Sequence, residues 1–404
     1  MRLRTLCAFA ISVPVVVACS ADGGSTTASE FVSVDSAGVR IADNGSLSDA
    51  KPWRPAGPSL EIGTVAGDPN DQLYRVSSAK RLPDGRILVA NAGSREIRLY
   101  SVSGDHLLSF GGSGDGPADF RYPSDVAVAP DGSIRVQDRG DLVYFTMGGE
   151  LTRRETLDRG ALGETIEGPF EGGSWVDGET YVVPEYDWEA GASPRTPGPP
   201  YRPAMTFISV HMPTQATDTL GEFGGILQQF RDVGGGRAMP VVPPFSHSST
   251  FYSGGGKFVV GDNAESEFHV YSPDGSHLIV RWHDEPESIT DQEVAAWKDE
   301  QRAASWTDGQ LPELERGWAG MALPPYKAFY ASVMPTSDGA YWLNETAKDG
   351  NARLVRFTPE GRYDREVILP DFYRVMDGGA DWVLIVARDD LEVEYLRLYE
   401  WPPR

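Results

Sequence analysis

Cysteine is nearly absent from this sequence, because its 404 residues include only Cys7 and Cys19. Residues 20–404 therefore contain no disulfide, no thiolate nucleophile and no cysteine metal site. A fold built from them must be held together by packing, and the 40% of hydrophobic residues are enough for a real core. Glycine (45) and proline (30) are abundant, which favours a chain with many turns over a helical one.

Positive charge is also scarce. The 36 lysines and arginines face 59 aspartates and glutamates, so the formal net charge is −23. An acidic surface of this kind repels phosphate backbones, and we therefore expect no nucleic-acid partner. The simplest role of the acidity is to keep the protein soluble.

The N-terminus has the pattern of a signal peptide. Arg2 and Arg4 give a short positive region, and residues 6–17 are almost entirely apolar. An apolar stretch of about twelve residues is too short to cross a bilayer but is typical of the middle of a signal peptide.

The residues that follow, Val16-Val17-Ala18-Cys19, resemble the lipobox of bacterial lipoproteins. The resemblance implies that residues 1–18 are removed and that Cys19 carries lipid, which makes the membrane a partner. Ser20 resembles the sorting pattern for the outer membrane of the cell envelope. The alternative is an ordinary secretory signal followed by a chance cysteine.

Residues 19–52 are rich in serine, glycine, threonine, alanine and aspartate, a composition typical of a flexible tether. We expect one short strand within it, at residues 31–41. The expected domain comprises residues 53–404.

A repeat of about 47 residues organises this domain. When residues 60–91 are laid over residues 107–138, Pro83-Asp84-Gly85 falls on Pro130-Asp131-Gly132, and Ser77 falls on Ser124. Each Pro-Asp-Gly predicts a tight turn, because proline presets φ and glycine accepts a positive φ. The apolar runs on either side of it predict the two strands of a hairpin.

A second signature consists of an aromatic residue, a serine or threonine, two further residues and a glycine. Its four copies begin at Tyr100, Phe145, Tyr271 and Phe357. The aromatic residue ends a buried strand, and the glycine turns the chain into the outer strand. Four strands in each unit of about 47 residues predict the blades of a β-propeller.

These signatures resemble NHL-type repeats, within the broader group of TolB-like six-bladed propellers. The run Asp35-Ser-Ala-Gly-Val-Arg-Ile41 also resembles a group of bacterial lipoproteins with six-bladed propellers. The resemblance implies an all-β fold with four-stranded blades, and it implies no particular activity.

The expected blades cover residues 73–113, 120–160, 170–222, 245–287 and 328–369, followed by a last blade at residues 371–401. Residues 60–62 align with an outer-strand position of the first blade, so we expect them to close the last blade and remove the exposed edges. The spare length is not strand-like, which disfavours the alternative of a seventh blade.

Three insertions fall where loops share one face of a propeller, here called the looped face: residues 185–203, 223–244 and 288–327. The third holds the one expected helix, from Thr290 to about Ala304. Thr290 and Glu293 match a capping box, and Ile289 and Val294 match a hydrophobic staple.

Candidate ligand-binding residues gather at this face. Arg75, Arg121 and Tyr122 lie where inner strands begin, and arginine suits a carboxylate or phosphate ligand, although an ion pair with a neighbouring carboxylate is the alternative. His247 lies near the start of an inner strand. The remaining candidates are the aromatic residues Trp188, Trp306, Trp318 and Tyr326, which either wall a ligand pocket or pack an insertion onto the ring.

Two enzyme groups with this fold offer alternative chemistry. Amidating lyases of the NHL group bind zinc through three histidines near the channel, but only His247 is suitably placed here, since His106 and His277 follow turn glycines and are expected at the surface. Lactonases of the gluconolactonase type hold calcium through Glu, Asn and Asp. The residues Asn91, Asp138, Asp262 and Glu345 recur after second strands, where capping a turn is their usual role.

The sequence therefore predicts a lipid-anchored propeller of the bacterial cell envelope that binds a protein, peptide or glycan without catalysis, and no cofactor or metal is expected. A metal-dependent hydrolase or lyase with its site at the central channel is the alternative.

Overall fold

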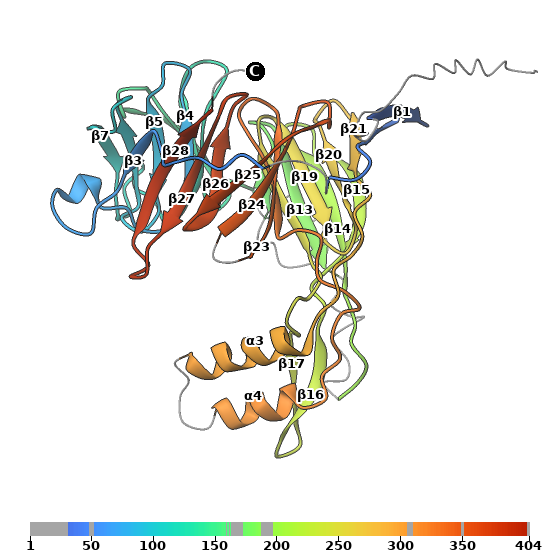
Figure 1. Ribbon diagram of the computed structural model, residues 1–404. Coiled ribbons are helices and arrows are strands. Elements are labelled where there is room, and N and C mark those ends of the chain that lie inside the picture. The colour runs from blue at the N-terminus through green and yellow to red at the C-terminus, as the bar shows by residue number, and fades with distance from the viewer. Residues whose placement is uncertain are drawn as a thin grey trace, which may run out of the picture.

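The computed structural model describes residues 31–47, 52–158, 160, 162, 173–186, 197–304, 310–348 and 351–401. Cys19, Trp188 and Trp306 lie outside these residues, as does the predicted signal peptide. The described chain forms a six-bladed β-propeller whose blades stand side by side around a central axis (Figure 1). The predicted fold is confirmed, including four antiparallel strands in each blade.

The blades run in chain order, each from its inner to its outer strand. Blade 1 contains β4 (Val76–Arg81), β5 (Ile87–Asn91), β6 (Glu96–Tyr100) and β7 (His106–Gly111). Blade 2 contains β8 (Pro123–Val128), β9 (Ile134–Asp138), β10 (Asp141–Phe145) and β11 (Leu151–Glu155). Blade 3 contains β12 (Ser174–Trp175), β13 (Thr180–Tyr186), β14 (Ala204–His211) and β15 (Ala216–Gly224).

The second half of the ring repeats this plan. Blade 4 contains β18 (Ser249–Gly254), β19 (Lys257–Asp262), β20 (Glu267–Tyr271) and β21 (His277–Arg281). Blade 5 contains β22 (Ser332–Pro335), β23 (Tyr341–Lys348), β24 (Asn351–Phe357) and β25 (Tyr363–Pro370). Blade 6 contains β26 (Phe372–Gly378), β27 (Trp382–Arg388) and β28 (Glu394–Glu400), with β3 (Leu60–Ile62) as its outer strand.

The ring closes as the sequence predicts. Strand β3 pairs antiparallel with β28, and Ile62 lies opposite Leu396. Ile62 is only 3% exposed and packs into the core between blades 6 and 1. The closing strand therefore links the two ends of the propeller through both hydrogen bonds and apolar contacts.

The turn signatures act as expected. The glycines that end the four aromatic signatures, Gly104, Gly149, Gly275 and Gly361, have φ between 81° and 88°, a left-handed conformation that other residues adopt only with strain. The aromatic residues that begin these signatures are all buried between neighbouring blades. Each signature thus supplies one turn and one core side chain.

The N-terminal part of the predicted tether contains two strands where one was expected. β1 (Val32–Ser36) and β2 (Val39–Asp43) form a hairpin, and β2 pairs in parallel with β21 at the outer edge of blade 4. Ala37 and Gly38 turn the chain with positive φ, so the segment folds back on itself.

The insertions form a small layer that projects from one face of the ring, below blades 3 and 4 in Figure 1. It contains β16 (Gln229–Gly234), β17 (Arg237–Val241), α3 (Asp291–Ala303) and α4 (Gln310–Trp318). The predicted helix is α3, and its capping box at Thr290 and Glu293 is confirmed. Helix α4 and the hairpin were not expected from the sequence.

No helix among the described residues is long and apolar enough to span a membrane.

Candidate functional site

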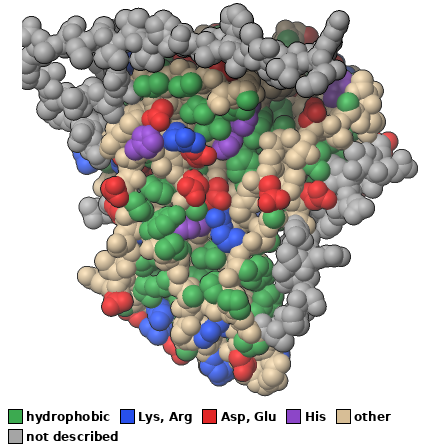
Figure 2. Space-filling view, turned by 90° about the vertical axis from the view of Figure 1, so that its right-hand side faces the viewer, with side chains coloured by type: hydrophobic (Ala, Val, Ile, Leu, Met, Phe, Trp, Pro, Cys, Tyr) green, Lys and Arg blue, Asp and Glu red, His purple; other side chains and the backbone are tan. Residues whose placement is uncertain are grey.

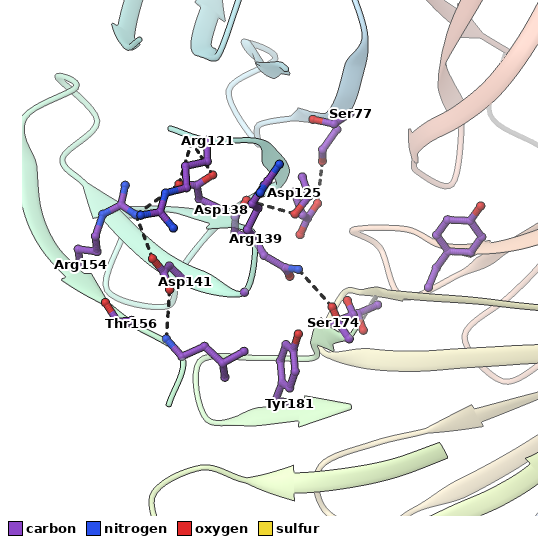
Figure 3. A pocket seen from close by; sticks show the side chains of 18 of the residues that line it. Ser77, Arg121, Asp125, Asp138, Arg139, Asp141, Arg154, Thr156, Ser174 and Tyr181 are labelled. Carbon is purple, nitrogen blue, oxygen red and sulfur yellow. Dashed lines mark hydrogen bonds and ion pairs between the residues drawn. The ribbon is translucent and has the colours of Figure 1, made fainter. Parts of the chain in front are cut away.

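A cavity of about 1190 Å³ lies at the central channel and continues onto the looped face. The connection between β7 and β8 borders it, together with the turn between β9 and β10 and the start of the connection after β11. These are the kinds of loops that the sequence analysis assigns to the functional face. Figure 3 shows how the charged side chains of blade 2 gather on one side of this cavity.

Asp138, at the end of β9, fixes the rim of the cavity. Its side chain is 1% exposed and accepts hydrogen bonds from the backbone N–H groups of Arg121 and Tyr122, at 3.0 and 2.7 Å. Asn91 accepts from the N–H of Tyr74 in the same way at 2.8 Å. The capping role predicted for Asn91 and Asp138 is therefore what the structure shows.

The same role in blade 4 belongs to Asn263, which accepts from the N–H of Ser248 at 2.7 Å. Asp262, for which a turn-capping role is also expected, accepts from the N–H of Ala264 at 3.0 Å and in addition forms an ion pair with Arg202. Glu345 is no turn cap of this kind. It forms an ion pair with Arg353 on the neighbouring strand, and burial raises the pKa of its carboxyl group.

Arg154 on β11 joins the parts of the rim. Its guanidinium lies 3.3 Å from Asp138 and 3.2 Å from Asp141, and it also donates to the carbonyls of Pro117 and Asp119 at 3.1 and 2.6 Å. One side chain therefore holds the long connection between blades 1 and 2 against the outer strand of blade 2.

Deeper in the cavity, the inner strands present hydroxyl and charged groups. Ser78 on β4 donates a 2.7 Å hydrogen bond to Asp125 on β8. Arg374 on β26 donates to the carbonyl of Val76 at 2.6 Å. The buried Oγ of Ser253 and Nε of Arg374 form no hydrogen bond with any residue that the structure describes.

Among the residues that the structure describes, the charges that line the cavity balance. The five cationic residues are Lys80, Arg121, Arg139, Arg154 and Arg374, and the five carboxylates are Asp115, Asp119, Asp125, Asp138 and Asp141. Serine, threonine and tyrosine hydroxyls contribute much of the remaining wall. A wall with equal cationic and anionic groups and many hydroxyls offers both donors and acceptors without favouring a charged ligand.

Of the candidate residues from the sequence, Arg121 lines this cavity and points toward Asp138 (Figure 3). Tyr122 is exposed on the adjoining surface, and Arg75 lies exposed over the ring of Tyr74, 5.2 Å from its centroid. These residues mark the mouth of the channel without forming one cluster.

His247 and Tyr326 come together elsewhere, beside the inserted layer. His247 is 4% exposed, its Nε2 lies 2.9 Å from the carbonyl oxygen of Tyr326, and the two rings are in contact. Burial lowers the pKa of this imidazole. Trp318 is buried against Trp297 within the inserted layer, so its contacts are those of a core residue.

Asp125, Arg154, Ser253 and Arg374 were not singled out in the sequence. A signal for Asp125 was present, because Ser78 and Asp125 differ by the repeat length of 47 and occupy equivalent positions of adjacent inner strands. Within the described residues, no three His, Cys, Asp or Glu side chains are grouped so that they could hold a metal ion.

The fold and the site define a six-bladed β-propeller with a polar cavity at its looped face. Some known proteins are similar to it in sequence or in structure. No family model matches the sequence. A 69-residue segment is 39% identical to the E3 ubiquitin-protein ligase NHLRC1 of Rattus norvegicus, and a 57-residue segment is 37% identical to the Homo sapiens protein. The first match covers 17% of this chain and 17% of the rat protein, the second 14% of each. The similarity agrees with the NHL-type resemblance.

Solved structures with a similar arrangement include the virginiamycin B lyase of Staphylococcus aureus, with a TM-score of 0.38 and 9% identity over 85% of this chain and 99% of the lyase. The calcium-binding protein regucalcin of Agrobacterium tumefaciens has a TM-score of 0.37 and 11% identity over 86% of this chain and 95% of its own. A member of the DUF4221 family from Bacteroides vulgatus has a TM-score of 0.44 and 11% identity over 85% of this chain and 97% of that protein. Because these TM-scores lie below 0.5, no property is transferred from these proteins.

Proposed function

We propose that this protein is a non-catalytic binding protein that holds a neutral glycan in the cavity at its looped face. The observation that carries the proposal is the composition of the cavity wall, in which five cationic and five carboxylate side chains accompany many hydroxyls. Each sugar hydroxyl both donates and accepts a hydrogen bond, so a wall that offers both kinds of group suits it. An anionic or cationic ligand would favour a wall with an excess of the opposite charge.

The volume is compatible with an oligosaccharide. A cavity of about 1190 Å³ exceeds the upper end, about 1,000 Å³, of the usual range for small-molecule pockets. Asp125 and the serine and tyrosine hydroxyls of the wall supply acceptors and donors in the channel. We expect the sugar ring to replace the water that satisfies these groups in the free protein.

A glycan array with neutral, acidic and amino sugars tests the proposal. The expected result is saturable binding of neutral oligosaccharides, weakened at least tenfold by Asp125→Ala, with the oligosaccharide recovered intact after incubation. The matched control is Asp131→Asn, an exposed aspartate in the Pro-Asp-Gly turn of the same blade, for which no loss is expected. Binding restricted to charged sugars, or equal losses for both variants, would contradict the proposal.

We also propose that the protein is attached to the bacterial outer membrane by lipid on Cys19. Support comes from the lipobox resemblance in the sequence, and residues 19–30 connect the cysteine to β1. Two or three acyl chains, at about 0.8 kcal/mol for each buried CH₂, make such attachment stable. In cell fractionation, Cys19→Ser should move the protein from the membrane to the soluble fraction, and unchanged membrane retention would refute the anchor.

A further inference from the structure

The outer grooves between adjacent blades are filled by the chain itself at two places in the ring. Between blades 6 and 1, the connection that contains η1 (Pro69–Asp71) lies against β6. Arg98 of β6 donates to the carbonyls of Pro69, Asn70 and Gln72 at 2.9–3.2 Å. Tyr100 donates its hydroxyl to the carbonyl of Asn70 at 2.6 Å. A short piece of backbone thus fills this groove and satisfies its polar side chains.

The groove between blades 1 and 2 is filled in a comparable way, because Arg154 donates to the carbonyls of Pro117 and Asp119. In both cases the filling segment is the connection that leads from one blade into the next, and the blade that follows supplies donors to its carbonyl groups.

Blade 4 repeats the sequence pattern of blade 1 in the same register. Glu96, Arg98, Tyr100 and His106 correspond to Glu267, His269, Tyr271 and His277, since the spacing within each set is identical. In both blades the tyrosine lies directly opposite the histidine in the strand pairing. Blade 4 therefore repeats the tyrosine that donates to a backbone carbonyl in blade 1, while His269 takes the place of Arg98.

The connection from blade 3 to blade 4 does not lie in this groove. After β15 the chain leaves the ring to form the β16–β17 hairpin of the inserted layer. A cavity of about 590 Å³ occupies the groove instead, lined by β15, β20 and the start of β14. Figure 2, which views this side of the ring, shows histidine and carboxylate side chains together above the inserted layer.

Tyr271 is the clearest sign of a missing partner. Its side chain lines the cavity and is 8% exposed, and its hydroxyl forms no hydrogen bond with a residue that the structure describes. The equivalent hydroxyl of Tyr100 donates to a carbonyl. Tyr271 is held in place by stacking on His277, with ring centroids 4.3 Å apart. The sequence analysis placed His277 at the surface, but it is partly buried in this stack.

A chain of hydrogen bonds fixes the histidines. The Nε2 of His269 lies 3.3 Å from the carboxylate of Glu267, and its Nδ1 lies 3.0 Å from Nε2 of His277. When Nε2–H of His269 donates a hydrogen bond to the carboxylate, Nδ1 of His269 accepts a hydrogen bond from Nε2–H of His277. Burial lowers the pKa of His277 to about 4, so the imidazole of His277 is uncharged at neutral pH.

The groove has an excess of negative charge. Among the described residues, its lining includes the four carboxylates Glu222, Asp262, Glu265 and Glu267 and one guanidinium, that of Arg202. Asp262 pairs with Arg202, and Glu267 pairs with Arg281 outside the lining. Glu222 and Glu265 are exposed at the edge, and neither forms an ion pair with a described residue. A cationic ligand would therefore be favoured at this edge.

We propose that this groove between blades 3 and 4 binds a short basic segment of a partner polypeptide. A backbone carbonyl of the segment accepts from the hydroxyl of Tyr271, as Asn70 accepts from Tyr100, and lysine or arginine side chains pair with Glu222 and Glu265. The site is separate from the channel cavity and does not depend on the proposed function.

Fluorescence anisotropy with the full-length chain tests the proposal, using a labelled Gly-Lys-Ser-Lys-Ser-Lys-Gly peptide and its counterpart with glutamate in place of lysine. The lysine peptide should bind saturably, and Glu222→Gln combined with Glu265→Gln should raise its Kd about tenfold. Tyr271→Phe should raise the Kd about threefold to tenfold, the loss of one hydrogen bond.

The matched control combines Glu150→Gln with Asp390→Asn, which removes the same charge from exposed positions in other blades and should change the Kd less than twofold. Equal losses for the two double variants, equal binding of the glutamate peptide, or no binding of the lysine peptide would each overturn the proposal. Because Glu222 and Glu265 are exposed, that double variant decides the result even if Tyr271→Phe does not fold. Asp125→Ala should leave peptide binding unchanged, which separates this groove from the channel site.

Discussion

Replacing Arg154 by alanine tests how the rim of the channel cavity is built. The change removes a guanidinium that is 21% exposed, and it leaves the carboxylate of Asp138, 1% exposed, without its cation. It also frees the carbonyls of Pro117 and Asp119. Breaking a buried ion pair by removing one partner costs about 3–5 kcal/mol, and partial exposure of Arg154 places the expected loss near the lower value, about 3 kcal/mol.

This loss can be converted into a melting temperature. The unfolding entropy of globular proteins, about 2 cal/mol/K per residue, sums to roughly 0.7 kcal/mol/K for a propeller of this size. A loss of about 3 kcal/mol therefore lowers Tm by about 4 °C if the ring unfolds as one cooperative unit. Differential scanning calorimetry at neutral pH and moderate salt measures this shift.

Arg153 provides a matched control on the same strand. Its side chain is 50% exposed, pairs with the exposed Glu155, and lies over the ring of Tyr144. Surface ion pairs and exposed cation–π contacts contribute at most about 1 kcal/mol each, so Arg153→Ala should lower Tm by no more than about 3 °C. Equal shifts for the two variants, or a shift below 1 °C for Arg154→Ala, would refute the reasoning.

Three further predictions concern the ring and its pH dependence. Gly361→Ala should destabilise the protein by at least 2 kcal/mol in urea unfolding, because φ is +82° and the new Cβ would lie 2.8 Å from Ala42 and Val280. An unchanged midpoint of urea unfolding would show that the turn tolerates a side chain. The hydrogen bond from His269, with help from Arg281, lowers the pKa of Glu267 to about 2 from an ordinary value near 4.5. The ionised carboxylate therefore adds about 3 kcal/mol to the free energy of unfolding above pH 4.5, and this contribution is lost as the pH falls toward 2. Glu267→Gln should therefore unfold more easily than the native protein at pH 7 and equally easily near pH 2, and a constant difference across this range would argue against the assignment. His277 acts in a higher pH window, since burial lowers its pKa to about 4 and the unfolded chain takes up the proton first. Between pH 7 and pH 4.5 the free energy of unfolding should therefore fall more steeply in the native protein than in His277→Gln.

Much of the ring could be predicted from the sequence because short local motifs specify its turns. A Pro-Asp-Gly turn and a glycine three residues beyond a serine or threonine specify backbone conformations wherever they occur, and their regular spacing reveals the repeat. The closing strand at residues 60–62 followed from the same register. The helix α3 was predictable from its capping box, which is also a local signal.

Features that depend on contacts between residues far apart in the sequence could not be predicted from it. The hairpin β16–β17 turns at Gly235 and Gly236, which have positive φ, but its strands pack on α4, where Arg316 donates to the carbonyl of Val233. Arg154 resembles its neighbour Arg153 in sequence, and only the pleat of β11 places one in the rim network and the other in solvent. Likewise, the open groove beside Tyr271 arises because a connecting segment leaves the ring, which no residue of blade 4 reveals.

The central claim is that the cavity at the looped face holds a neutral glycan. Hydrogen–deuterium exchange with and without a bound neutral oligosaccharide tests it most directly. The account predicts slower exchange in residues 114–125, 137–141 and 251–253, which border or line the cavity, and unchanged exchange in residues 216–224 and 267–277 of the groove between blades 3 and 4. Protection confined to that groove or to the inserted layer, with none around the channel, would contradict it.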